Sequence, residues 1–277
     1  MLNQKNLNYI GANNRESILD IELPDNPNAI VLFIHGYKGF KDWGAWNLVQ
    51  SFFVSNRIGF AKLNLSHNGG TTANPIDFPD TEAFGNNCYS YEVFDVESVI
   101  SLLHEYVDLI NVPLFLIGHS RGGGIALLSG VNKYVKGVIT WASVASFEER
   151  FPLGKELEEW KKSGVRFIKN GRTKQELPHY FSFYEDFKQN KEKLTISKAA
   201  LRLKESKKAC FHVHGTKDEA VDVNELSRIA DWTKGETLIM ENANHTFAAK
   251  HPWEENTLPE ELKTVCSKTL DFLSRNI

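Results

Sequence analysis

The feature that most constrains the fold is a short apolar run that ends in a cluster of glycines around a single serine. Residues 112–117 read VPLFLI, residues 118–124 read GHSRGGG, and residues 125–128 are apolar again. A buried strand that turns sharply into a helix needs small residues beside the turn, because the two backbones pass too closely for a Cβ atom. The residue at the apex stands clear of the sheet. The pattern therefore predicts a nucleophile elbow that presents the hydroxyl of Ser120.

Two other glycine-rich motifs do not fit the same segment. A phosphate-binding loop needs Gly-Lys followed by Ser or Thr, where this chain has Gly123, Gly124 and Ile125. A dinucleotide fingerprint needs a G-x-G-x-x-G spacing and an acidic residue about 20 positions later. Neither spacing is present in the sequence.

A serine hydroxyl is a poor nucleophile until a base removes its proton, so the elbow requires a histidine and a carboxylate elsewhere in the chain. Both follow in the order Ser, Asp, His. The apolar run 209–213 leads into a loop that contains Asp218, and the run 236–240 leads into a loop that contains His245. This chain order is typical of mainly parallel sheets with a nucleophile elbow.

The two residues have distinct predicted roles. Asp218 accepts the Nδ1 proton of His245 and so fixes its tautomer, and His245 then takes the proton of Ser120. Asp222 is the alternative acid.

A tetrahedral intermediate needs two preorganised donors for its oxyanion, and one usually comes from the residue after the nucleophile. The sequence predicts the backbone N–H of Arg121 as this donor. The second predicted donor is the backbone N–H of Tyr37, because its loop, residues 35–40, follows a strongly apolar strand and contains two glycines.

The other histidines are given structural rather than catalytic roles. His212 and His214 alternate along a strand, and no further ligands stand at a workable spacing, so we predict no metal site. We expect His35 and His119 to orient the backbone around the oxyanion loop and the elbow. His67 is predicted at the edge of the substrate pocket.

Apolar runs alternate with helical patterns along the chain, which predicts an α/β fold with a mainly parallel sheet covered on both faces. A hairpin is expected over residues 7–23 with Asn13 and Asn14 at its turn. Strands are expected at 29–34, 59–65, 112–117, 135–142, 209–213 and 236–240, and helices at 43–53, 89–106 and 258–273.

More than 60 residues separate the runs at 135–142 and 209–213, which is too long for a crossover through one helix. We therefore expect a core formed by residues 1–145 and 202–277 and an inserted helical cap at residues 146–201. Nine aromatic residues lie between positions 147 and 187. Among them, Trp160, Phe181 and Tyr184 are the predicted pocket residues, and exposed cap aromatics would favour a homodimer.

Composition excludes several classes of function. The 277 residues carry a formal charge of −3, so no basic surface for nucleic acid is expected. The N-terminus is polar, and no run of 18 apolar residues exists, so we expect a cytoplasmic protein that does not bind a membrane. Three widely separated cysteines favour reduced thiols over disulfides.

Four motifs together resemble those of the α/β-hydrolase superfamily. They are HGY at 35–37, GHSRGG at 118–123, HGTKD at 214–218 and NHTF at 244–247. Within the superfamily, the chain is similar to dienelactone-hydrolase-like and cinnamoyl-esterase-like serine hydrolases. The resemblance implies an eight-stranded sheet, a triad of Ser120, Asp218 and His245, an acyl-enzyme, and no cofactor. The chain departs from dienelactone hydrolase, which has a cysteine nucleophile, and from cinnamoyl esterases, which usually have Gln at the position of Arg121.

The leading hypothesis is a carboxylesterase that acts on small-molecule esters of small to medium acyl groups, with aromatic groups among the candidates. An acyl-peptide or aminopeptidase-like hydrolase, a thioesterase and an acyltransferase would form the same acyl-enzyme. A ligand receptor that keeps the fold without turnover is the alternative from another class.

Overall fold

A sheet of eight strands forms the centre of the computed structural model, which describes residues 1–277. Pairing is antiparallel for the first three strands across the sheet and parallel for all the others. In spatial order the strands are β1 (Leu2–Ile10), β2 (Glu16–Leu23), β4 (Ile58–Leu63), β3 (Ala29–Ile34), β5 (Leu114–His119), β6 (Val135–Trp141), β9 (Ala209–Gly215) and β10 (Glu236–Met240).

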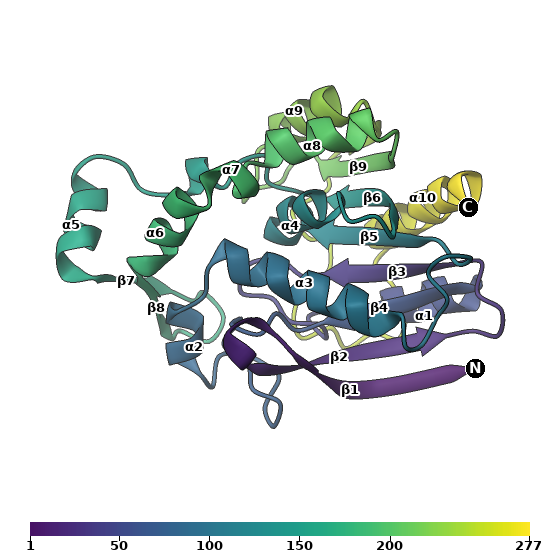
Figure 1. The fold of residues 1–277 in the computed structure, drawn as a ribbon, viewed down its shortest axis with the longest axis horizontal. Coiled ribbons are helices and arrows are strands. Elements are labelled where there is room, and N and C mark those ends of the chain that lie inside the picture. Colours follow the sequence, from purple (N-terminus) through teal and green to yellow (C-terminus); the bar gives the residue numbers. More distant parts are fainter.

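Helices cover both faces of this sheet (Figure 1). In β3, Ile30, Leu32 and Ile34 belong to one buried core, whereas Val31 and Phe33 belong to the other. Successive side chains of a strand point to opposite faces, so an all-apolar strand such as β3 must be covered twice. One core contains α3 (Tyr89–Leu103), α4 (Arg121–Ser129), α8 (Ile196–Glu205) and α9 (Asn224–Thr233), and the other contains α1 (Trp46–Ser55) and α10 (Glu260–Asn276).

The fold class expected from the sequence, a mainly parallel eight-stranded sheet between helices, is confirmed. The turn of the first hairpin also lies where it was expected, since Asn13 and Asn14 have φ angles of 51° and 55° between β1 and β2. The ends of elements differ by a few residues. The helix expected to reach residue 106 ends at Leu103, and the last helix continues to Asn276.

The segment 146–201, expected to be helical, also contains strands, so that part of the prediction is wrong. Its elements are η2 (Glu148–Arg150), α5 (Lys155–Ser163), β7 (Val165–Lys169), β8 (Glu176–Tyr180), α6 (Ser182–Gln189), α7 (Lys191–Leu194) and most of α8. The two strands pair with each other as a separate antiparallel hairpin, with Val165 opposite Tyr180 and Lys169 opposite Glu176.

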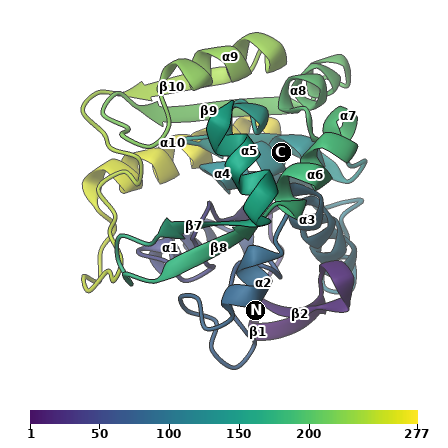
Figure 2. The same cartoon turned by 90° about the vertical axis from the view of Figure 1, so that its left-hand side faces the viewer.

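The hairpin and α5 lie beyond the carboxyl ends of the parallel strands (Figures 1 and 2). Helix α8 packs instead against α4 and α9, within the helix layer of the main sheet. The division into a core (1–145 and 202–277) and a cap (146–201) stays our proposal.

A cluster of buried ion pairs lies where β2 meets β4. The Lys62 ammonium is fully buried and binds Asp20 at 2.7 Å, Asn47 at 2.9 Å, and Asp42. The Lys41 ammonium is also buried and binds Asp20 at 2.9 Å and Asp42 at 2.5 Å. Each cation therefore has two carboxylate partners. No helix of the chain is both long enough and apolar enough to cross a membrane.

Candidate active site

Ser120 lies between the end of β5 and the first residue of α4, with φ 57° and ψ −123°. This is a left-handed conformation that a residue with a side chain rarely adopts, and it costs about 1–3 kcal/mol. A Cβ atom on Gly118 would come within 2.1 Å of the Gly122 carbonyl oxygen, and one on Gly122 within 2.3 Å of the Ile34 oxygen. Both glycines are therefore required by close backbone contacts at the predicted elbow.

Asp218 and His245 lie in direct contact, although they come from loops after different strands. The Nδ1 of His245 donates to Asp218 Oδ2 at 2.8 Å, and the Asp218 side chain is fully buried. The backbone N–H groups of Ala220 and Val221 donate to the other carboxylate oxygen at 2.8 Å each. The alternative acid, Asp222, accepts from the Asn224 N–H instead.

The surroundings of Asp218 keep its carboxylate ionised. Burial alone would raise its pKa, but hydrogen bonds from His214 and His245 hold the pKa well below its ordinary value. The Nε2 of His214 lies 3.1 Å from Asp218 Oδ2. An ionised, hydrogen-bonded carboxylate can orient the imidazole of His245 and stabilise its protonated form.

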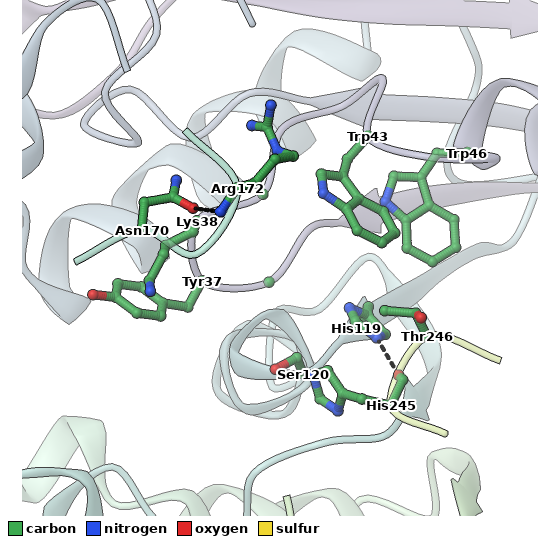
Figure 3. Close-up of a pocket in the computed structure, with 12 residues that line it drawn as sticks. Tyr37, Lys38, Trp43, Trp46, His119, Ser120, Asn170, Arg172, His245 and Thr246 are labelled. Atoms are coloured by element: carbon green, nitrogen blue, oxygen red, sulfur yellow. Dashed lines mark hydrogen bonds between the residues drawn. The ribbon is translucent and has the colours of Figure 1, made fainter. Parts of the chain in front are cut away.

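Ser120 and His245 both line two adjoining cavities, and Figure 3 shows them with His119 along one side of the first. No hydrogen bond joins the Ser120 hydroxyl to His245 in this structure. Such bonds are often long in the absence of substrate and shorten when it binds. The three predicted triad residues are thus brought to one site, with one of the two expected contacts formed.

The backbone N–H groups of Tyr37 and Arg121 have no hydrogen-bond acceptor within the protein. Tyr37 follows β3 and lines both cavities, and Arg121 is the first residue of α4, where a helical N–H lacks an intrahelical partner. Free amides beside a serine at a helix N-terminus are suited to a developing negative charge.

His35 and His119 hold the backbone around these donors. The Nε2 of His119 donates to the carbonyl of His245 at 2.9 Å, the contact dashed in Figure 3. The Nδ1 of His35 donates to the Gly36 carbonyl at 2.9 Å, and its Nε2 accepts from the Leu65 N–H. Burial lowers the pKa of His35 to about 4 and that of His119 to about 3, so both rings are neutral at pH 7.

The two cavities differ in their walls. The loop cavity, of about 230 Å³, is lined by 12 residues: Gly36, Tyr37, Lys38, Gly39, Trp43, Trp46, His119, Ser120, Asn170, Arg172, His245 and Thr246. The cap cavity, of about 440 Å³, is lined by 16 residues: Tyr37, Lys38, Tyr89, Ser120, Arg121, Val144, Phe147, Arg150, Phe151, Arg166, Ile168, His179, Phe183, Ala220, Val221 and His245. Tyr37, Lys38, Ser120 and His245 belong to both.

None of the four predicted pocket residues lines either cavity. His67 is buried, with its Nδ1 2.8 Å from Ser66 Oγ and its ring beside Tyr91. Trp160 is buried within the cap and donates its indole N–H to the carbonyl of His179 at 2.8 Å. A large amphipathic ring is often used to tie elements together in this way, which sequence alone does not distinguish from contact with a ligand.

Phe181 and Tyr184 pack behind the cavity wall, against Trp160 and Phe151. The wall itself is formed by Phe147, Phe151 and Phe183 together with Tyr89 of α3, whose ring stacks on Phe147 at 3.8 Å. The three phenylalanines were among the nine cap aromatics. No sequence pattern identified Tyr89, because its contact with the cap joins elements far apart in the chain.

The side chain of Arg121 forms part of the wall of the cap cavity. Its guanidinium lies 4.1 Å from the centre of the Tyr37 ring and 3.2 Å from Glu92. Burial raises the pKa of Glu92, and the charge of Arg121 opposes that rise. This pair was not anticipated from the sequence, although an arginine inside the elbow motif beside an acidic helix could have suggested it.

No three His, Cys, Asp or Glu side chains lie close enough together to hold a metal ion. No family model matches the chain, and no curated protein matches it in sequence. Comparison with solved structures gives many similar chains at low identity.

Three of these similar structures are esterases. Est1E from Butyrivibrio proteoclasticus, solved with ferulic acid bound, is 13% identical with a TM-score of 0.71, covering 97% of this chain and 98% of its own. A thermostable carboxyl esterase from Bacillus coagulans, solved with glycerol, is 15% identical with a TM-score of 0.69, covering 100% and 99%. The esterase domain of a Rhodothermus marinus protein is 13% identical with a TM-score of 0.64, covering 99% of both chains. At these identities the likeness is one of architecture, and together with the sheet order and the elbow it shows that this protein has the α/β-hydrolase fold.

Proposed function

We propose that the protein is a serine hydrolase that cleaves carboxylic esters through an acyl-enzyme on Ser120. The observation that carries the proposal is the convergence of a conformationally strained serine and a His245–Asp218 pair on one cavity. A strained serine at a strand-to-helix turn has no evident structural use, since a glycine would adopt its φ angle without cost.

In the proposed first step, Ser120 Oγ attacks the acyl carbon while His245 Nε2 takes the hydroxyl proton. The carbonyl oxygen becomes an oxyanion that accepts hydrogen bonds from the amides of Tyr37 and Arg121. His245 then gives the proton to the leaving alcohol as the ester C–O bond breaks. Water, deprotonated by His245, attacks the acyl-enzyme and releases the acid and the free serine.

The size and walls of the cavities support small to medium acyl groups, aromatic ones included. The cap cavity has apolar walls in Val144, Phe147, Phe151 and Phe183, and its volume suits a single ring with a short chain. The similar structure of Est1E was solved with ferulic acid bound, which supports an aromatic acyl group among the candidates.

The test is labelling and turnover of Ser120 variants. The wild-type protein should be labelled by a fluorophosphonate at Ser120, and Ser120→Ala should lose p-nitrophenyl ester turnover by about a millionfold. Ser274→Ala, at an exposed serine of α10, is the matched control and should keep both. Full turnover in a correctly folded Ser120→Ala protein would disprove the proposal.

The same acyl-enzyme would serve an acyl-peptide or aminopeptidase-like hydrolase, a thioesterase or an acyltransferase. Relative kcat/KM values for ester, thioester and aminoacyl-anilide substrates with one shared acyl group separate these activities. A receptor that lacks turnover would bind a ligand unchanged and leave Ser120 unlabelled. A cytoplasmic location, a homodimer and the absence of nucleic-acid and membrane partners stay predictions.

A further inference from the structure

The cap cavity is lined by four cationic side chains and by no carboxylate. The cations are Lys38, Arg121, Arg150 and Arg166. A binding site for a neutral ester needs apolar walls and a few hydrogen-bond donors, and it gains nothing from excess positive charge beside the nucleophile.

Two of the four cations have buried carboxylate partners. Arg121 pairs with Glu92, and Arg150 pairs with Glu225, whose second oxygen accepts the Ala145 N–H at 2.6 Å. The charge of each arginine is thus balanced from behind the cavity wall. These two ion pairs stabilise the wall of the cap cavity, so neither arginine needs a ligand to balance its charge.

The other two cations, Arg166 and Lys38, have no ion-pair or hydrogen-bond partner. The Nε of Arg166 is buried and unpaired, and its guanidinium lies over the Trp160 ring at 4.6 Å. The Lys38 ammonium lies 5.0 Å from the centre of the Tyr37 ring. Burial lowers the pKa of both side chains, and for Lys38 the neighbouring Arg121 lowers it further. Withdrawal of a cation from water is unfavourable unless an anion compensates for it.

A third unpaired group lines the same cavity. His179 is 3% exposed, its Nε2 forms a 2.6 Å hydrogen bond with the Tyr37 hydroxyl, and its Nδ1 has no partner. Burial lowers the pKa of His179 to about 3, so the ring is neutral and able to offer an N–H. Buried polar atoms are seldom left unpaired in a protein unless water or a ligand completes them.

We propose that the cap cavity binds a carboxylate carried by the substrate, held by Arg166 and Lys38, so that the preferred substrate is an anionic ester with an aromatic or apolar body. This inference rests on the proposed esterase function and narrows its substrate class. A carboxylate matches the planar fork of a guanidinium, and the surrounding aromatic rings hold the apolar part of the molecule. The carboxylate belongs either to the acyl half or to the alcohol half of the ester.

Strand β7 supplies both the residue to test and its control. Arg166 and Ile168 line the cap cavity, whereas Phe167 is 60% exposed and Lys169 is exposed on the opposite face of the strand. Arg166→Gln and Lys169→Gln each remove one positive charge from the same strand, at positions on its opposite faces. Only the first removes it from the cavity.

The experiment compares kcat/KM for charged and uncharged esters of matched shape. The acyl arm uses the p-nitrophenyl monoester of glutarate against p-nitrophenyl hexanoate, and the alcohol arm uses p-carboxyphenyl acetate against p-tolyl acetate. In one arm the wild-type protein should prefer the anionic ester, and Arg166→Gln should lower the charged-to-uncharged ratio by about 10- to 100-fold. Lys38→Gln should lower it in the same direction, and Lys169→Gln should leave it unchanged.

A preference for the uncharged ester in both arms, or a ratio that Arg166→Gln does not alter, would overturn the inference while leaving the esterase proposal intact. Loss of all ester turnover and of fluorophosphonate labelling would instead remove the proposed function. Binding can still be measured in that case, because calorimetry of phenylpropionate with Ser120→Ala requires no catalysis. Arg166→Gln in that background should weaken binding at least about 10-fold relative to Lys169→Gln, and equal binding would contradict the proposed carboxylate site.

Discussion

Two sets of cations in this protein differ in what faces them: one set is buried against carboxylates, and the other is half-buried and has no ion-pair partner. Lys41 and Lys62, where β2 meets β4, are each held by two carboxylates. Lys38 and Arg166, in the cap cavity, are held by none. The charges of the first set are balanced by carboxylates of the folded chain, whereas we propose that those of the second set are balanced by the carboxylate of a bound substrate. Burial of a charge therefore indicates a structural role or a binding role according to what faces it.

The largest effect expected from this comparison is on stability, at the paired set. Lys62→Met leaves the buried Asp20 and the partly buried Asp42 with a single ammonium between them, which should lower the free energy of unfolding by about 3–5 kcal/mol. Urea denaturation at pH 7 measures the loss. Lys136→Met, at an exposed lysine of β6, is the control and should change stability by no more than about 0.5 kcal/mol. Equal stabilities for the two variants would show that the cluster contributes nothing net.

The paired set should also make stability depend on pH in the acid range. Burial would raise the pKa of Asp20 and Asp42, but the two lysines lower both. Because their folded-state pKa values lie below the unfolded value of about 3.9, the stabilisation is complete above that pH and is lost as the pH falls through the folded pKa. The free energy of unfolding, measured with urea, should therefore fall by roughly 1–3 kcal/mol below about pH 4. Asp20→Asn should flatten this profile, and an unaltered profile would assign the acid sensitivity to other groups.

A smaller effect is expected from the unpaired set. Arg166→Gln removes a half-buried charge that forms no ion pair, so its free energy of unfolding should stay within about 1 kcal/mol of the wild type or rise slightly. The measurement is the same urea titration. A loss as large as that of Lys62→Met would mean that Arg166 is a structural residue, and the contrast between the two sets would disappear.

The smallest effect concerns salt. Added sodium chloride should raise KM for the preferred anionic ester by roughly twofold to fivefold, because the cap cavity is open to ions. The matched uncharged ester serves as the reference and should show no such rise. The stability attributed to the Lys62 cluster should respond much less to the same salt, since pairs with buried ammonium groups are poorly screened. A salt response that is equal for both esters would exclude an electrostatic origin.

Local sequence patterns predicted the parts of the molecule that depend on neighbours in the chain. The elbow at Ser120 follows from glycine spacing, and the meeting of Asp218 with His245 follows from their positions after adjacent parallel strands. Both kinds of inference use backbone geometry that recurs wherever strands alternate with helices.

The walls of the site could not be predicted in the same way. Trp160 was expected to face a substrate, but its indole ties the cap together, and Tyr89 reaches the cavity from a helix of the core. Which side of an aromatic residue faces a cavity depends on long-range packing that leaves no periodic signal. The ion pairs of Lys62 with Asp20 and of Arg121 with Glu92 also join distant segments, and nothing adjacent in the sequence marks them.

If the protein is the esterase proposed above, strand β7 is a place where its substrate preference can change over evolution. Arg166 and Ile168 stand on a two-stranded hairpin that has no hydrogen-bonded neighbour in the main sheet. Substitutions at these positions could alter the charge and width of the cavity while the elbow, the His245–Asp218 contact and the sheet remain as they are. Selection for a new ester could therefore act on a few alternate codons of one short strand, and that strand is the natural place to begin redesigning the cavity.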